Sequence, residues 1–212
     1  MVSHFFMKNK VVNFGALLSL AGLFVMVSTL QSPVRVSVDG AIMRYVESIQ
    51  TQGGLIVMKV LTDMFSPEII VALTAVLVCL CLYKKYYYKA VLFTLVTAAG
   101  GLSLWWLKST LQDARPETFF IEESFSFPSG HSAMVVIFFL LVGYFFVVPI
   151  QSSVIRRSIV IACGLVVLAV GLSRVYLEMH WLSDVVGGYL LGIFWVSTGL
   201  VVVKNNFIFI KK

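Results

Sequence analysis

The composition of the 212-residue chain excludes an ordinary soluble domain: 59% of the residues are hydrophobic, 12% are charged and the mean hydropathy is +0.96. Soluble domains carry about 45–50% apolar residues and about 25% charge, whereas this apolar excess falls in discrete blocks, as in an integral membrane protein. The net charge of +6 comes from basic clusters between the blocks, which indicates membrane topology rather than nucleic-acid binding.

Six apolar blocks predict six transmembrane helices within one membrane-embedded domain, residues 1–212. The blocks are continuously apolar rather than alternating, which argues against an outer-membrane barrel. The fifth block is short for a hydrocarbon core of about 30 Å, so we expect its helix to extend past Arg174. The predicted spans are about 11–30, 67–83, 90–107, 132–148, 158–172 and 182–203. The predicted fold class is therefore an all-α integral membrane bundle.

The segment between the first two spans predicts a helical hairpin along the outer membrane interface. Apolar residues recur at helical spacing on both sides of Gly53-Gly54, which we expect to break the hairpin into two helices. Asp39 is a candidate cap for the first helix. Ser66 followed by Pro67 predicts the start of the second span, because proline fits the first turn of a helix.

The connecting segments alternate in charge and so predict the orientation of the chain. One side carries ten basic residues and no acid, whereas the other carries six basic residues and all ten acids. The basic side consists of Lys8, Lys10, Lys84, Lys85, Lys89, Arg156, Arg157, Lys204, Lys211 and Lys212. By the positive-inside rule, the sequence predicts a multi-pass cell-membrane protein with both termini in the cytoplasm.

Residues suited to binding an anion gather at the outer ends of spans three to six. The stretch "KSTLQDARP" provides Lys108 and Arg115, and "SRVYLEMHWLSD" provides Arg174. Three cations brought together repel one another unless an anion joins them, and the planar fork of arginine suits phosphate. In "PSGH", Ser129 and Gly130 precede an apolar span, where the free N–H groups of a helix start favour an anion.

The same clusters contain a possible nucleophile and a possible acid. His180 and Asp184 are four residues apart, so on a helix they lie one turn apart on the same face. The carboxylate fixes one imidazole tautomer and leaves the other nitrogen free to attack, while His131 is placed to act as the acid. This set predicts phosphoryl transfer to water through a phosphohistidine on the extracytoplasmic side. Asp113 and Glu117 lack a metal-ligand constellation, so nothing in these clusters calls for a metal or another cofactor.

Each cluster also has a structural interpretation when it is taken singly. Basic residues at span ends commonly anchor a helix in the headgroup layer, a histidine can cap a helix, and a His–Asp pair can brace a loop. A rival function is a non-catalytic transporter or scaffold that holds anionic lipids. Binding needs the cations but no nucleophile, so the complete His–Asp–His set argues for an enzyme.

Taken together, the clusters resemble the signature of the type-2 phosphatidic acid phosphatase superfamily. Residues 108–116 match K-x6-R-P, residues 128–131 match P-S-G-H, and residues 173–184 match S-R-x5-H-x3-D, over about 77 residues. The six-span layout is similar to that of bacterial membrane lipid phosphatases of the phosphatidylglycerophosphatase B type. Vanadium haloperoxidases share the signature, but they are soluble and six spans argue against them.

The resemblance implies a role for each matching position. The residues implied to hold phosphate oxygens are Lys108, Arg115, Ser129, Gly130 and Arg174. His180 would attack phosphorus, Asp184 would orient it and His131 would protonate the leaving group, without a metal. The implied partner is a membrane lipid with a terminal phosphate, either phosphatidylglycerol phosphate or undecaprenyl pyrophosphate, with phosphatidic acid as a third candidate. The motifs do not choose between these lipids, and they predict neither an oligomeric state nor a nucleic-acid partner.

Overall fold

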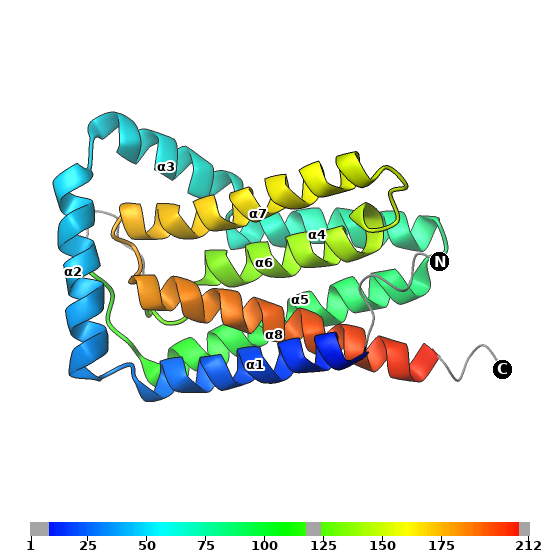
Figure 1. Cartoon of the computed structure of the whole chain (residues 1–212), viewed down its shortest axis with the longest axis horizontal. Helices are drawn as coiled ribbons and strands as arrows, with labels where there is room; N and C mark the ends of the chain where they lie inside the picture. The colour runs from blue at the N-terminus through cyan, green and yellow to red at the C-terminus, as the bar shows by residue number, and fades with distance from the viewer. Residues whose placement is uncertain (1–8, 118–123, 208–212) are drawn as a thin grey trace.

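The structure is a computed structural model that describes residues 9–117 and 124–207. Lys8, Lys211, Lys212, Glu122 and Glu123 therefore lie outside the described residues. The described residues are mostly helical and contain no strand, which confirms the predicted all-α class. Its elements are α1 (Asn9–Ser28), α2 (Pro33–Ile49), α3 (Gln52–Met64), α4 (Pro67–Tyr83), α5 (Tyr87–Leu111), α6 (Gly130–Val142), the π-helical turn η2 (Gly143–Val147), α7 (Ser153–Tyr176) and α8 (Leu182–Phe207) (Figure 1).

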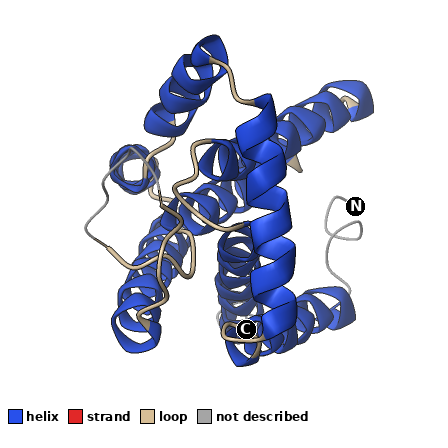
Figure 2. Ribbon diagram, turned by 90° about the vertical axis from the view of Figure 1, so that its left-hand side faces the viewer, coloured by secondary structure: helices blue, strands red, loops and turns tan. Residues whose placement is uncertain are grey.

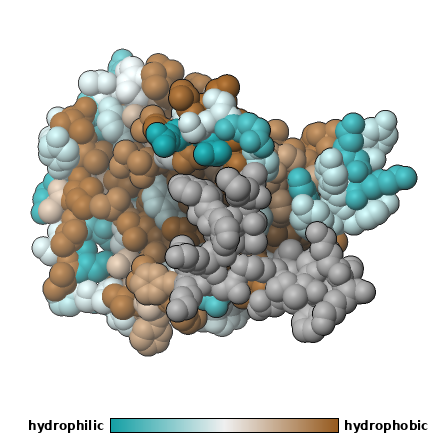
Figure 3. Space-filling view, turned by 45° about the vertical axis from the view of Figure 1, so that its right-hand side comes forward, coloured by the Kyte–Doolittle hydropathy of each residue, from teal (hydrophilic) through white to brown (hydrophobic). Residues whose placement is uncertain are grey.

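The described helices are long and apolar enough to cross a membrane five or six times. The five single stretches are Gln52–Tyr83, Tyr87–Leu111, Gly130–Val147, Ser153–Tyr176 and Leu182–Val202. A sixth is reached if α1 and α2, which are bent by 93° to each other, count as one broken span. Large apolar side chains such as Leu95, Leu102 and Leu165 are exposed. Hydrophobic residues cover much of the surface in Figure 3, as expected for helices that face lipid.

Serine caps define where several of the helices begin. Ser32 and Ser66 each precede a proline and accept a hydrogen bond from the backbone N–H three residues later, so α2 and α4 both begin with a cap and a first-turn proline. The start at Ser66-Pro67 was predicted correctly. The predicted cap at Asp39 was wrong, because α2 begins at Pro33 and Asp39 lies buried inside it. The hairpin breaks at Gln50-Thr51 rather than at Gly53-Gly54, which lies in the first turn of α3.

The two hairpin helices take different directions. Helix α2 lies across the end of the bundle, as Figure 1 and the end-on view in Figure 2 show. Helix α3 instead turns back beside α7, and α3 and α4 together form one apolar stretch of 32 residues. The first turn of α3 is held against α7 because Thr51 N–H donates to the Tyr176 hydroxyl at 3.0 Å. Gly54 permits this contact, since a Cβ there would lie 2.2 Å from the same hydroxyl.

Small residues let α6 and α8 pack closely, and this packing joins two of the sequence motifs. A Cβ at Gly188 would lie 2.5 Å from the Ser129 carbonyl oxygen, and one at Gly192 would lie 2.8 Å from the Ala133 carbonyl oxygen. This small-x-x-x-small spacing on α8 lets two helix backbones approach in a membrane. The Ser129 N–H also donates to the Asp184 carbonyl at 3.0 Å. The starts of α6 and α8 are thus fixed side by side.

We predict that Gly188→Ala destabilises the protein, because the added methyl group meets the α6 backbone. Overpacking of this kind costs about 1–3 kcal/mol, so the thermal unfolding temperature in detergent should fall. Gly164→Ala is the matched control, since a Cβ there meets nothing within 4 Å, and replacing a helical glycine should leave stability unchanged or raise it. Equal unfolding temperatures for the two variants would contradict the close α6–α8 contact.

Candidate active site

An open cavity of about 690 Å³ lies where α5 and α7 end and where α6 and α8 begin. Six of the eight predicted site residues line it: Lys108, Arg115, Gly130, His131, Arg174 and His180. Asp184 and Ser129 are buried and are absent from the lining. The structure thus brings residues from three separate sequence motifs to one cavity.

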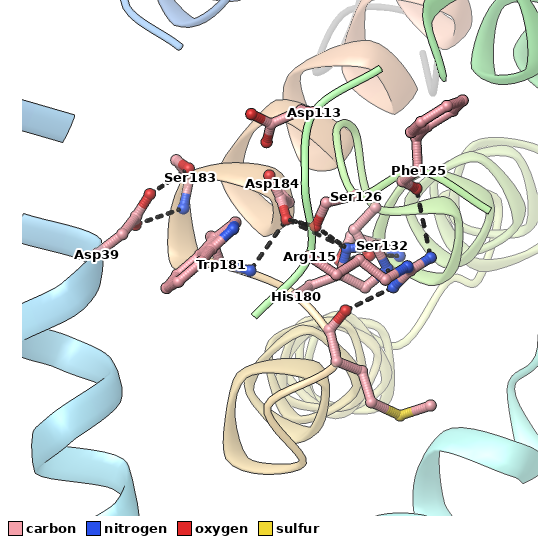
Figure 4. A network of polar contacts seen from close by, with 12 residues as sticks. Asp39, Asp113, Arg115, Phe125, Ser126, Ser132, His180, Trp181, Ser183 and Asp184 are labelled. Carbon is pink, nitrogen blue, oxygen red and sulfur yellow. Dashed lines mark hydrogen bonds and ion pairs between the residues drawn. The ribbon is translucent and has the colours of Figure 1, made fainter. Parts of the chain in front are cut away.

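The buried pair of His180 and Asp184 forms the centre of the site (Figure 4). The Nδ1 atom of His180 lies 3.2 Å from Oδ2 of Asp184. The same oxygen accepts the Trp181 N–H at 2.9 Å, an N-terminal capping contact of α8, and also accepts the Ser126 hydroxyl. This carboxylate favours the tautomer with hydrogen on Nδ1, which puts the lone pair of the ring on Nε2.

Two of the cations hold the loop that precedes α6, and one of them, Arg115, also reaches His180. Arg115 donates through Nε to the Ser124 carbonyl at 2.6 Å, and its Nη1 lies 3.2 Å from Nε2 of His180. Lys108 donates to the Ser126 carbonyl at 3.1 Å. Positive charge therefore lies beside Nε2, the ring nitrogen that would meet phosphorus. An anion in this position would be favoured electrostatically.

The third cation, Arg174, is 1% exposed and ties α3 to the site. Its Nη1 donates to the Thr62 hydroxyl of α3 at 3.3 Å, and Thr62 is itself fully buried. Helices α3 and α4 then form a second cavity wall, which the sequence did not predict. This wall consists of Lys59, Asp63, Ser66, Pro67 and Glu68.

Within the "PSGH" stretch, Ser129 caps a helix, whereas Gly130 and His131 line the cavity. Ser129 is the N-cap of α6, where its hydroxyl oxygen accepts the Ser132 N–H at 3.5 Å and the Ser132 hydroxyl at 3.1 Å. A direct contact of Ser129 with phosphate therefore stays a prediction. Gly130 lines the cavity, and a Cβ there would meet only Pro67, at 3.8 Å, so the chain leaves room beside this helix start. His131 follows it on the cavity wall, half-buried.

Two residues of this network were missed by the sequence motifs. Ser126 contacts Asp184, as described above, and Arg35 of α2 donates to the second Asp184 oxygen, Oδ1, at 3.3 Å. Arg35 also forms a two-pronged ion pair with Asp113, at 3.1 and 2.7 Å. No periodicity or spacing in the sequence links residue 35 to residues 113 and 184, so no signal could have found this contact.

Burial shifts the pKa of two acids that lie near the site but outside the spans. The pKa of Asp113 is raised chiefly by burial and further by the Asp184 and Asp39 carboxylates, against the opposing effect of Arg35. The pKa of Glu178 is also raised by burial, with repulsion from Glu47 adding to it. Among the described residues, no group of three His, Cys, Asp or Glu side chains is placed to hold a metal ion.

Comparisons with known proteins agree on one family. The model of the PAP2 superfamily matches residues 44–208. The phosphatidylglycerophosphatase B of Bacillus subtilis (strain 168) is 38% identical over 91 residues, which make up 41% of this chain and 44% of that relative, so the match spans less than half of the relative's length. A crystal structure of a transmembrane PAP2 type phosphatidylglycerolphosphate phosphatase from B. subtilis matches with a TM-score of 0.80 and 26% identity, covering 88% of this chain and 96% of that one.

Proposed function

The chain belongs to the PAP2 superfamily, and we propose that it is a membrane lipid phosphatase that removes a terminal phosphate from a lipid phosphate or pyrophosphate. The observation that carries the proposal is the placement of His180, with Asp184 on one ring nitrogen and a cation-lined cavity at the other. A transporter or scaffold for anionic lipids would use the cations but would have no need of this buried pair.

In the first step, the Nε2 lone pair of His180 attacks phosphorus. An N–P bond forms, the bond from phosphorus to the lipid oxygen breaks, and His131 gives that oxygen its proton. Asp184 accepts the Nδ1 hydrogen and stabilises the positive charge that grows on the ring. Lys108, Arg115 and Arg174 bind the phosphoryl oxygens, where negative charge is concentrated in the transition state.

In the second step, water attacks the phosphohistidine. His131, now without its proton, takes one from the water; the new P–O bond forms and the N–P bond breaks. Inorganic phosphate leaves, and both histidines return to their starting protonation states. The Gly130 N–H, at the start of α6, assists at the phosphate, and Ser129 supports it by capping that helix.

The substrate that we favour is phosphatidylglycerol phosphate, as the printed names of the relatives indicate for those proteins. Undecaprenyl pyrophosphate is the second candidate and phosphatidic acid the third. All three present a terminal phosphate at headgroup level while their tails remain in the bilayer. The cavity lies at the end of the apolar bundle, which suits such a lipid.

We further propose that both termini lie in the cytoplasm and that the site opens on the extracytoplasmic side. The cavity and helix α2 occupy one end of the bundle, whereas α1 begins and α8 ends toward the other end (Figure 1). The basic turn of Lys84 and Lys85, between α4 and α5, belongs to the end remote from the cavity. The positive-inside rule then places the cavity outside.

His180→Ala should abolish phosphate release. Loss of a catalytic nucleophile reduces kcat by several orders of magnitude, here about a thousandfold or more. Purified protein is assayed with phosphatidylglycerol phosphate in mixed micelles, and Arg44→Ala, a change at an exposed residue of α2, is the control for purification and assay. Equal release from wild type and His180→Ala, or no release from either, would overturn the hydrolase proposal.

Accessibility labelling tests the orientation. In a background with Cys79, Cys81 and Cys163 replaced by alanine, Glu117→Cys should react with an impermeant thiol reagent added to intact cells, because residue 117 is exposed near the cavity. Lys84→Cys, at the opposite end, should react only after the cells are opened. The reverse pattern would place the active site in the cytoplasm.

A further inference from the structure

Two charged side chains of helix α2, Arg35 and Asp39, form hydrogen bonds with the start of α8. The carboxylate of Asp39 accepts the Ser183 N–H at 3.1 Å and the Ser183 hydroxyl at 2.6 Å (Figure 4). Arg35, one turn earlier on α2, donates to the Ser183 hydroxyl at 2.9 Å and to Oδ1 of Asp184 at 3.3 Å. Since Asp184 lies in the first turn of α8, these contacts set where its carboxylate stands.

The other end of α2 holds the segment on the far side of His180. Gln50, the C-cap of α2, donates its amide hydrogens to the Tyr176 carbonyl at 2.7 Å and to the Glu178 carboxylate at 2.6 Å. Glu178 has φ = 55°, a left-handed conformation that non-glycine residues seldom adopt without outside support. Helix α2 therefore lies along the α7–α8 turn that carries His180 and is hydrogen-bonded to both ends of that turn.

Arg35 is the cation within a group of three carboxylates. Its guanidinium lies 2.8 Å from Asp39, 2.7 Å from Asp113 and 3.3 Å from Asp184, and its side chain is 12% exposed. A buried carboxylate without a nearby cation favours its protonated form. Asp184 must instead be ionised to accept the Nδ1 hydrogen and to stabilise the charged ring.

We propose that Arg35 is a positioning residue for the hydrolysis: its ion pair with Oδ1 turns the Asp184 carboxylate so that Oδ2 faces His180. Arg35 and Asp39 lie outside the residues matched by the family model, 44–208, so their contacts with the start of α8 are not part of the three motifs. The inference rests on the proposed phosphatase function. Through Arg35, helix α2, which crosses the end of the bundle, would help to orient the His180 nucleophile.

The test compares Arg35→Ala and Arg35→Lys with Arg44→Ala, a change on the same helix at an exposed position. Mutation of residues that orient metal ligands lowers activity or metal affinity by about 10–100-fold. We expect a loss of similar size here: kcat should fall by about 10–100-fold in Arg35→Ala, while KM changes less than threefold. Millimolar methylguanidine should restore part of the activity to Arg35→Ala and none to His180→Ala.

The controls separate positioning from folding and from the activity itself. Arg35→Lys keeps a charge but not the planar fork, so it should fold if the alanine variant does not, and its kcat should fall less than that of Arg35→Ala. An unchanged kcat, or a fall in kcat that methylguanidine does not rescue, would overturn the proposal. If wild type released no phosphate, the proposed function would fail instead.

The second cavity wall carries a separate inference. Lys59 and Asp63 form an ion pair on α3 with N–O distances of 2.6 Å, and their side chains are 40% and 55% exposed. The buried contact between Thr62 and Arg174 fixes the rotation of α3, so that Lys59 and Asp63 line the same cavity as His180. An exposed pair of this kind is weak and exchanges partners readily.

From this wall we infer that Lys59 binds a second phosphate of the substrate, which deepens the proposed function. Cavities of this volume hold ligands much larger than one phosphate group. Lys59 is the one cation among the described lining residues contributed by α3 and α4, which also contribute the acids Asp63 and Glu68. Asp63 thus competes with the second phosphate for Lys59, and the long lysine stem can turn from one to the other.

Substrate comparison tests this contact. Lys59→Gln should raise KM for phosphatidylglycerol phosphate and undecaprenyl pyrophosphate about tenfold and leave KM for phosphatidic acid, which has one phosphate, unchanged. Asp63→Asn should lower KM for the two-phosphate lipids, and Lys84→Gln, at the far end of the bundle, should change nothing. Comparing the effect of Lys59→Gln on KM for phosphatidylglycerol phosphate and for undecaprenyl pyrophosphate shows whether Lys59 favours a phosphodiester or a diphosphate. Equal effects on all three lipids would overturn the inference, whereas absence of any hydrolysis by wild type would overturn the proposed function.

Discussion

The buried carboxylate of Asp184 is the constraint on which the site depends. It lies with 0% exposure at the start of α8, inside the protein, where an ion without donors would be very costly. Its donors are the Trp181 N–H, the Ser126 hydroxyl, the Arg35 guanidinium and the His180 ring. These groups come from the start of α8, the loop before α6, helix α2 and the α7–α8 turn. The chain satisfies this one ion only when all four segments are in place, and the same arrangement aims His180 at the cavity.

Close helix packing makes that assembly possible. Gly188 and Gly192 remove the side chains that would hold α8 away from α6, and a hydrogen bond from the Ser129 N–H to the Asp184 carbonyl joins the two helix starts. Hydrophobic burial gives little drive between helices in lipid, so close backbone contact and hydrogen bonds must supply the specificity. The interior of the membrane bundle and the polar site at its end are therefore stabilised by the same contact between α6 and α8.

The sequence predicted what local pattern and spacing encode. Apolar blocks gave the helical bundle, and Ser66-Pro67 gave the start of α4, because cap and proline act within one turn. The three motifs gave the residues that meet at the cavity. Asp39 was misread as a cap because a cap and a long-range acceptor for Ser183 look alike in sequence. Arg35 and Lys59 were not assigned to the site because their neighbours depend on how α2 and α3 pack in the folded protein. No residue spacing in the sequence indicates that packing.

The contacts of Arg115 connect substrate binding with activation of the nucleophile. Its guanidinium lies against Nε2 of His180, the atom that attacks phosphorus in the proposed mechanism, and it also binds the Ser124 carbonyl. A lone pair that accepts a hydrogen bond from a guanidinium is a poor nucleophile. A phosphate is a stronger acceptor for that guanidinium than either an imidazole or a carbonyl. In the proposed mechanism, a bound phosphate would therefore draw Arg115 toward its own oxygens and release Nε2 beside the phosphorus atom. On that proposal the histidine becomes reactive only when a phosphate is bound, while Asp184 and Arg35 hold the ring in line.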